Sequence, residues 1–307
     1  MKPAPFEYVA PRSIDEAIAA LAEGGADAKI LAGGQSLIPL LNFRLARPTL
    51  LVDLNRVIEL AYVTPRDGGV AIGAMTRQRT AEHTPELAHA QPLLVEAIGH
   101  VGHTAIRSRG TVGGSLAHAD PAAELPAVAV CLEAQLTIAG PRGRRKVAAE
   151  DFFQGYLTTL LEPDEILIDS WLPPLRPRTG QAWVEFARRH GDFALAGVAV
   201  SLSLDAAGDV SAARIVLTGV GGKPERAREA ETLLSGGSIA ERASAAANAA
   251  RSAIDPDSDI HASKEYRTHL AGVLTERAIR LAYERAKHAE PAALDVRRAL
   301  ETLGRHA

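Results

Sequence analysis

The chain has 307 residues, 47% of them hydrophobic and 23% charged, which is typical of a folded protein of about two domains. Its net charge of −3 gives no sign of a nucleic-acid partner or of an acidic membrane surface. Because Cys131 is the single cysteine, an internal disulfide, an iron–sulfur cluster and a cysteine-rich zinc site are all excluded from this chain. Any such metal centre must lie on another chain.

No targeting segment or membrane span is evident. The first residues, 1–6, lack the apolar core of a signal peptide. The longest purely apolar run, residues 125–132, is far shorter than the roughly 18 residues that cross a bilayer. We therefore expect a cytoplasmic protein, and we interpret Cys131, which lies in this run, as a small core residue.

Hydrophobic periodicity predicts mixed helices and strands in the first half of the chain. A helix over 11–25 starts with the capping-box spacing of Ser13 and Glu16 and stops at two glycines. In chain order we then expect buried strands at 29–32, 50–53 and 70–73, helices at 87–101 and 122–133, a hairpin at 135–150 and a strand at 164–172. The basic hairpin tip, 142–146, is either a solvated surface or a docking patch.

The proline-rich stretch 173–180 is the best linker candidate, and the pattern changes after it. Residues 200–204 alternate as a strand with one wet face does, and 214–218 form the returning strand. Helices are expected at 227–234, 240–253 and 265–287. The sequence thus predicts an α+β domain over 1–175 and a smaller α+β domain over 181–290.

Two glycine turns are the candidate binding elements. The first covers residues 32–37, Ala-Gly-Gly-Gln-Ser-Leu, and follows a predicted strand. The second lies within 107–121 and contains Gly113 and Gly114, the hydroxyls of Thr111 and Ser115, and two nearby arginines. Successive glycines can present main-chain N–H groups to a phosphate. Together the turns could hold the two phosphates of a dinucleotide, although a single Gly-Gly turn after a strand is more often a plain turn.

Other chemistry finds little support. The chain has no G-x-G-x-x-G, no P-loop, no H-E-x-x-H and no G-x-S-x-G motif. The spacing of His100, His103, His118 and Asp120 fits no standard metal site, and local hydrogen bonding is the simpler interpretation. Neither Ser36 nor Ser115 has a positioned base that would make it a nucleophile. We therefore predict no metal site and no acid–base pair on this chain.

At these residues the chain resembles the FAD-binding (medium) subunits of the molybdenum hydroxylases, of the carbon monoxide dehydrogenase and xanthine dehydrogenase type. The resemblance rests on A-G-G-x-S-L at 32–37, V-D-L at 52–54, and I-R-x-x-G-T-V-G-G-S with a following D-P at 106–121. A run at 188–197, R-R-H-G-D-F-A-L-A-G, and Y-R-x-x-L at 266–270 complete it. The match runs through nearly the whole chain in the right order.

The resemblance implies a fold and a set of FAD contacts. The fold is a vanillyl-alcohol-oxidase (PCMH) type FAD domain of two α/β subdomains, followed by a domain with a three-stranded antiparallel sheet and C-terminal helices. The implied contacts are Ala32, Gly33, Gly34, Gln35, Ser36 and Leu37 with Thr111, Gly113, Gly114 and Ser115 at the pyrophosphate, Glu124 near the adenosine, and Val101, Leu161 and Phe193 elsewhere along the cofactor. Phe193 is expected to pack on and gate the flavin.

Two positions depart from the family pattern. Gln35 stands where some members have histidine, and either side chain can donate a hydrogen bond. Glu185 stands where several members have a lysine that faces the cofactor, which puts that contact in doubt.

The resemblance also implies an electron-transfer role. Electrons from a molybdenum centre on a large subunit would pass through two 2Fe–2S clusters on a small subunit, reach FAD here and leave to an external acceptor. The assembly would be a dimer of heterotrimers, without nucleic acid or a membrane span. The alternatives are a stand-alone FAD oxidase with the vanillyl-alcohol-oxidase fold and a non-catalytic nucleotide-binding scaffold. Substrate and acceptor cannot be read from this chain.

Overall fold

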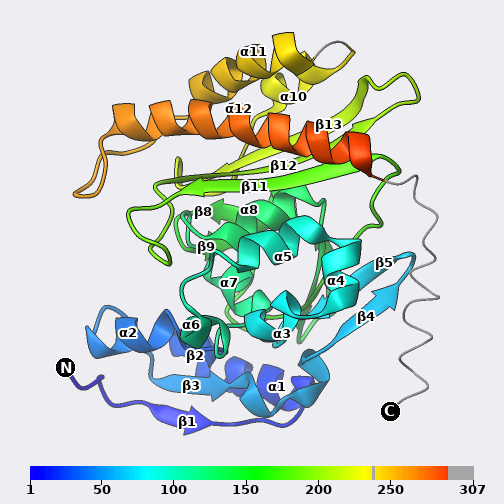
Figure 1. Cartoon of the computed structure of the whole chain (residues 1–307). Helices are drawn as coiled ribbons and strands as arrows, with labels where there is room; N and C mark the ends of the chain where they lie inside the picture. The colour runs from blue at the N-terminus through cyan, green and yellow to red at the C-terminus, as the bar shows by residue number, and fades with distance from the viewer. Residues whose placement is uncertain (237–238, 290–307) are drawn as a thin grey trace.

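The computed structural model describes residues 1–236 and 239–289. Its first part has two small α/β layers, and in its second part three helices cover one face of an antiparallel sheet (Figure 1). Within the described residues, the strands form sheets of three, five, four and two strands. Residues 173–178, within the predicted linker, connect the two parts.

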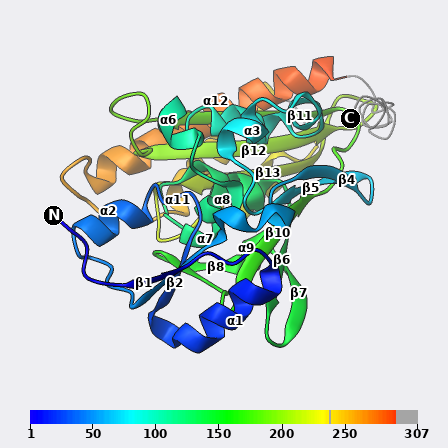
Figure 2. The same ribbon diagram turned by 90° about the horizontal axis from the view of Figure 1, so that it is seen from below.

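A parallel three-stranded sheet with order β1-β3-β2 forms the N-terminal layer. Its elements are β1 (Glu7–Val9), α1 (Ile14–Gly24), β2 (Ala28–Leu31), α2 (Leu37–Asn42) and β3 (Leu50–Asp53). The predicted capping residue Ser13 accepts the Glu16 N–H, and α1 buries Ile14, Ala17 and Leu21. Figure 2 shows α1 on the outer side of this sheet.

The second sheet is antiparallel, with order β4-β5-β10-β6-β7. Its strands are β4 (Val63–Arg66), β5 (Gly69–Gly73), β6 (Gln135–Gly140), β7 (Gly143–Ala148) and β10 (Ile166–Leu172). Side chains alternate between two cores: Ile168 packs with the N-terminal layer, whereas Leu167 packs with the helices on the other face. The predicted hairpin is therefore β6–β7, which projects from the body in Figure 2.

Short helices cover the second sheet. They are α3 (Gln78–Glu82), α4 (Pro85–Ala90), α5 (Pro92–Ile98), α6 (Thr104–Arg107), α7 (Val112–His118), α8 (Glu124–Cys131) and α9 (Ala149–Phe152), followed by the hairpin of β8 (Phe153–Gly155) and β9 (Thr158–Thr159). The prediction of one helix over 87–101 was wrong. Pro92 has no N–H to continue α4, so a new helix starts there and ends before Val101.

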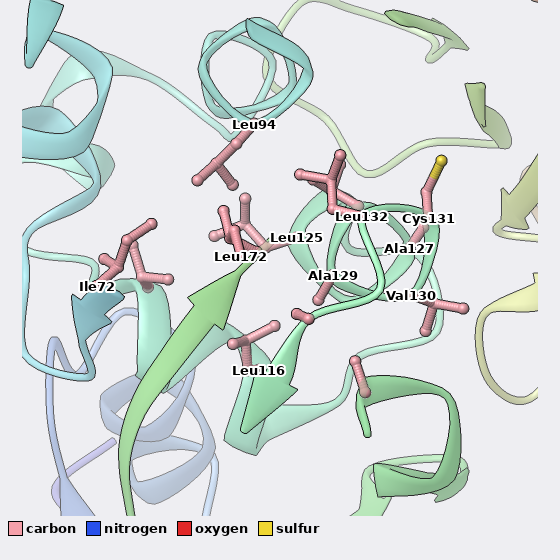
Figure 3. Close-up of a cluster of buried hydrophobic side chains, with 14 of the residues drawn as sticks. Ile72, Leu94, Leu116, Leu125, Ala127, Ala129, Val130, Cys131, Leu132 and Leu172 are labelled. Carbon is pink, nitrogen blue, oxygen red and sulfur yellow. The ribbon is translucent and has the colours of Figure 1, made fainter. Parts of the chain in front are cut away.

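Helix α8 is buried on every side, and it packs among Leu94, Leu116 and Leu172 (Figure 3). Cys131, its last residue, is a buried free thiol at one edge of this cluster, as the sequence predicted. Burial in apolar surroundings raises the pKa of this thiol far above its usual value, which leaves it an inert core side chain.

The second part contains a four-stranded sheet, β11-β12-β13-β14, covered on one face by helices. Its elements are β11 (Thr179–Phe186), β12 (Ala196–Leu204), β13 (Val210–Thr218), β14 (Glu225–Arg226), α10 (Arg228–Leu234), α11 (Ile239–Ser252) and α12 (Lys264–His288). Three of its strands have eight or nine residues, which agrees with the expected three-stranded sheet, and the two-residue strand β14 is a fourth strand. The predicted wet face of β12 is only partly exposed: Ser201 is half-buried and Ser203 is buried, because α12 covers one face of the sheet and the first part covers the other.

Candidate functional site

The two glycine segments lie directly against each other. A Cβ atom on Gly33 would lie 2.5 Å from the carbonyl oxygen of Arg109 and 2.7 Å from the Cα of Gly110. A Cβ atom on Gly114 would lie 3.4 Å from that of Ala32. The main chains can approach this closely only because these positions have no side chain. Segments about 80 residues apart in the sequence thus form one continuous surface.

The first segment leaves main-chain donors unused. Gly34 has a φ of +73°, in the left-handed region that favours glycine, and α2 begins just after Ser36. The side-chain amide of Gln35 donates to the Gly33 carbonyl at 3.1 Å and so braces the turn. Within the described residues, the N–H groups from Gly33 to Leu37 have no hydrogen-bond acceptor. They are therefore available to an anionic ligand.

The second segment differs from the turn that the sequence predicted. Gly113 and Gly114 lie in the first turn of α7, whose N-cap Thr111 accepts the Gly114 N–H at 3.0 Å. The Gly113 N–H donates to the Ala74 carbonyl at 2.9 Å, and the Ser115 N–H donates to that of Thr111. Gly113 is required for packing, because a Cβ atom there would lie 2.4 Å from the Cβ of Ala74. The glycine amides of this segment are thus already hydrogen-bonded, and the Ser115 hydroxyl is left as a donor.

A polar network behind the segments holds them together, and the sequence did not identify it. The Asn55 side chain donates to the Ala32 carbonyl at 3.0 Å and accepts from Arg77. The same guanidinium of Arg77 donates to the Arg109 carbonyl, so one side chain bridges both segments. Asp53 accepts from the Asn55 main chain and from Tyr8. The only signal was the V-D-L motif, which marks Asp53 but not its partners.

A cavity of about 500 Å³ adjoins this network. Asn55 and Arg77 are among its polar lining residues, and Val57, Ile58 and Met75 are among its apolar ones. Burial, together with the charge of Arg109, lowers the pKa of Arg77, which remains a cation at neutral pH. The cavity therefore combines one cation with apolar surface, and Asn55 in its lining connects it to the first glycine segment by donating to the Ala32 carbonyl.

The remaining predicted site residues lie outside the two glycine segments. Val101 packs against the core beside α5, and its carbonyl accepts from Arg107 at 3.0 Å. Leu161 is half-buried after β9. Phe193 is 62% exposed in the loop between β11 and β12, where it is free to cover a ligand.

Glu124, the first residue of α8, is a buried carboxylic acid. Burial raises its pKa to about 8, and the charge of Glu185 on β11 adds to this. Glu185 lies 3.3 Å from the ring nitrogen Nδ1 of His100, and this hydrogen bond raises the pKa of His100. The sequence named Glu124 and questioned Glu185 separately, and the structure brings both together.

Comparison with known proteins identifies the family. A family model described as "FAD binding domain in molybdopterin dehydrogenase" matches residues 4–175, and "CO dehydrogenase flavoprotein C-terminal domain" matches 181–282. The 6-hydroxypseudooxynicotine dehydrogenase complex subunit alpha of Paenarthrobacter nicotinovorans is 42% identical over 94% of this chain and 97% of its own. The chain belongs to the FAD-binding subunits of the molybdenum hydroxylases.

Solved structures agree with this assignment. The carbon monoxide dehydrogenase of Hydrogenophaga pseudoflava that lacks the Mo-pyranopterin moiety aligns with a TM-score of 0.91 and 40% identity, covering 93% of this chain and 99% of the solved one. Quinoline 2-oxidoreductase from Pseudomonas putida 86 gives a TM-score of 0.88 and 41% identity at the same coverage. The predicted family and fold class are therefore confirmed, and the chain is an FAD-containing oxidoreductase subunit.

Within residues 1–236 and 239–289, no helix is long and apolar enough to span a membrane. Nor does that part of the chain bring together three or more histidine, cysteine, aspartate or glutamate side chains in a way that could hold a metal ion.

Proposed function

We propose that this FAD subunit accepts electrons from 2Fe–2S clusters of a small partner subunit and passes them through FAD to an external acceptor. A large partner subunit with the molybdenum cofactor would oxidise the substrate. The single buried cysteine supports this division, because the clusters need ligands that this chain does not have. The names of its relatives, which include medium chains and subunits of dehydrogenase complexes, support a multi-subunit assembly.

The observation that carries the FAD site is the contact between the two glycine segments at Gly33. We propose that the pyrophosphate lies on this joint surface, held by the free amides of 33–37 and by the Ser115 hydroxyl. Ala32, Thr111, Gly113 and Gly114 would shape the surface, whereas Val101, Glu124, Leu161 and Phe193 would contact other parts of the cofactor. FAD supplies the redox chemistry when bound, and the protein supplies its position and electrostatic surroundings.

The assembly and its place in the cell follow as further proposals. We infer a dimer of heterotrimers, each with one large, one medium and one small subunit, in the cytoplasm. We also propose that residues 1–175 and 181–290 are the two domains. The last residue of that range lies outside the described part of the chain.

Reconstitution of the purified chain tests this function. We expect the folded chain to bind FAD stoichiometrically, with a flavin absorption spectrum, and to be reduced by dithionite. We also expect it to oxidise no organic substrate until the two partner subunits are added. A folded chain that binds no FAD would overturn the proposal. Substrate oxidation by the isolated chain would instead favour the stand-alone oxidase, and FAD that neither dithionite nor the partners reduce would favour a binding scaffold.

A further inference from the structure

Arg77, the N-cap residue of α3, is a half-buried cation that is held by uncharged groups. Its Nη1 donates to the Arg109 carbonyl at 2.5 Å, and its Nη2 donates to the side-chain oxygen of Asn55. Among residues 1–236 and 239–289, no carboxylate forms an ion pair with it. A cation that is partly removed from water normally has an anion beside it, because the anion offsets the lost hydration.

The neighbouring charges leave a positive excess around Arg77. Asp53 is the nearby carboxylate, but its oxygens accept from Tyr8 and from the Asn55 main chain. The Asn55 side chain accepts from Arg77 and donates to Asp53, so it separates the two charges. Arg109 is a second cation close by, and it has no ion pair in the described part of the chain. Because Arg109 is exposed, water screens its charge more than that of Arg77.

This charge lies close to the surface that the two glycine segments form. A Cβ atom on Gly33 would lie 2.5 Å from the Arg109 carbonyl oxygen, and Arg77 donates to that same oxygen at 2.5 Å. The guanidinium is therefore within about 5 Å of the side-chain position of Gly33, where charges interact strongly in a protein. Asn55, its second partner, donates to the Ala32 carbonyl at 3.0 Å. The cation thus lies one hydrogen bond away from each segment.

We propose that Arg77 supplies the positive charge that selects a pyrophosphate at this surface, so that the chain binds FAD in preference to riboflavin. The inference rests on the proposed function, which puts the FAD pyrophosphate on the joint surface. The free amides of 33–37 provide dipoles without net charge, whereas a pyrophosphate is anionic at neutral pH. Arg77 supplies the missing counter-charge at a distance, while its two hydrogen bonds keep the segments together. It is a positioning and selectivity residue.

Two substitutions separate the charge of Arg77 from its hydrogen bonds. Arg77→Lys and Arg77→Gln both lose the planar fork that bridges the segments, but only Arg77→Gln loses the charge. In the full-length chain at low salt, we expect Arg77→Gln to bind FAD about tenfold more weakly than Arg77→Lys. Riboflavin, which has no phosphate, should bind both variants equally weakly. Arg77→Met, a second neutral variant, repeats the comparison independently of whether Arg77→Gln folds.

Salt dependence distinguishes the charge from a purely structural role. Added KCl screens an attraction between charges, but it does not restore or remove a bridge between two segments. From about 0.05 to 0.5 M KCl, FAD affinity should therefore fall more steeply in wild type and Arg77→Lys than in Arg77→Gln. Arg79→Gln is the matched control, because Arg79 is an exposed cation of the same helix. It should keep the affinity and the salt dependence of wild type.

Inorganic pyrophosphate gives a readout that needs no flavin. Added alone to the apo chain, it should raise the Tm of wild type and of Arg77→Lys by more than that of Arg77→Gln. Equal FAD affinity and equal salt dependence in Arg77→Lys and Arg77→Gln would overturn the proposal, as would an equal loss in Arg79→Gln. If wild type gave the expected Tm shift with pyrophosphate but bound no FAD, only the proposed function would fail.

Discussion

At Gly33, one missing side chain decides whether the two glycine segments can touch. In Gly33→Ala the new Cβ atom would meet the Arg109 carbonyl oxygen and the Gly110 Cα, and neither main-chain atom can rotate away. We expect the segments to separate, at a cost of about 1–3 kcal/mol in the free energy of unfolding. FAD affinity should fall by about tenfold or more, since each tenfold corresponds to about 1.4 kcal/mol. Urea unfolding and FAD titration measure the two effects.

Gly155 is the matched control for this substitution. A Cβ atom on Gly155 has nothing within 4 Å and its φ is not positive, so Gly155→Ala should leave both quantities unchanged. If Gly33→Ala bound FAD as tightly as Gly155→Ala, the joint surface would not be the cofactor site.

Single residues were predictable where a local motif marks them. Gly33 and Gly114 were recognised because paired glycines stand out in any sequence. Asn55 and Arg77 were missed because their partners, Ala32 and Arg109, lie 23 and 32 residues away and no local pattern connects them. The sequence also could not show that the amides of the second segment are hydrogen-bonded within the protein, because Gly113 donates to the distant residue Ala74.

At the level of helices and strands, periodicity located most of the longer elements, but it missed the eight-residue strand β11 and many short helices and strands, such as α2 and β1. Other errors arose where another rule overrode the periodicity. The predicted helix over 87–101 has suitable apolar spacing throughout, yet Pro92 divides it. The strand β12 alternates serine with apolar residues as a half-exposed strand would, yet Ser203 is buried. Its second face is covered by a part of the chain about 75 residues earlier, and alternation alone does not report such tertiary contacts.

The packing of α12 on β11 depends on one glycine. A Cβ atom on Gly180 would come within 2.4 Å of the Ala286 main-chain nitrogen and still closer to the Ala282 carbonyl oxygen. Because both obstacles belong to the backbone, Gly180→Ala should push the helix from the sheet. We expect a loss of about 3 kcal/mol, at the upper end for an overpacked core, and faster hydrogen exchange at the C-terminal end of α12.

Gly155→Ala again provides the comparison, in the same solvent and by the same urea titration. Exchange in α8, which does not contact Gly180, should stay unchanged in both variants. Wild-type protection of α12 in Gly180→Ala would show that the helix accommodates the extra methyl group and that the close approach is not needed.

In the whole molecule, ion pairs and polar contacts join the two parts on several sides. Arg285 of α12 pairs with Glu96 of α5 at 2.7 Å, and the Gln181 side chain accepts the Leu93 N–H at 3.0 Å. These partners lie 88 to 189 residues apart, so no sequence pattern predicted them. Because Glu124, a proposed FAD contact, begins α8 beside the second part, contacts that hold the two parts together also hold this residue in place.

Glu150 is the most connected of these boundary residues. From α9 its carboxylate pairs with Arg214 at 3.5 Å, with Arg226 at 3.0 Å and with Arg228, all on the second part. Burial raises the pKa of Glu150, but the charges of Arg226 and Arg228 outweigh it and hold the pKa below its usual value. Replacement by glutamine leaves three neighbouring cations without this carboxylate. Glu150→Gln should therefore destabilise the chain by about 1–3 kcal/mol at pH 7.

The pH dependence of that loss identifies its cause. A carboxyl whose pKa is lowered on folding stabilises the native state above its unfolded pKa, and this contribution fades as pH falls through the folded pKa. The difference between wild type and Glu150→Gln should therefore be full at pH 7 and shrink below about pH 4.5. The urea midpoints of wild type and Glu150→Gln at pH 7 and at a pH below about 4.5 measure this difference in stability. Glu276→Gln, which breaks an exposed pair within α12, should cost only about 0.3–0.5 kcal/mol. An equal cost for both variants would mean that Glu150 does not hold the two parts together.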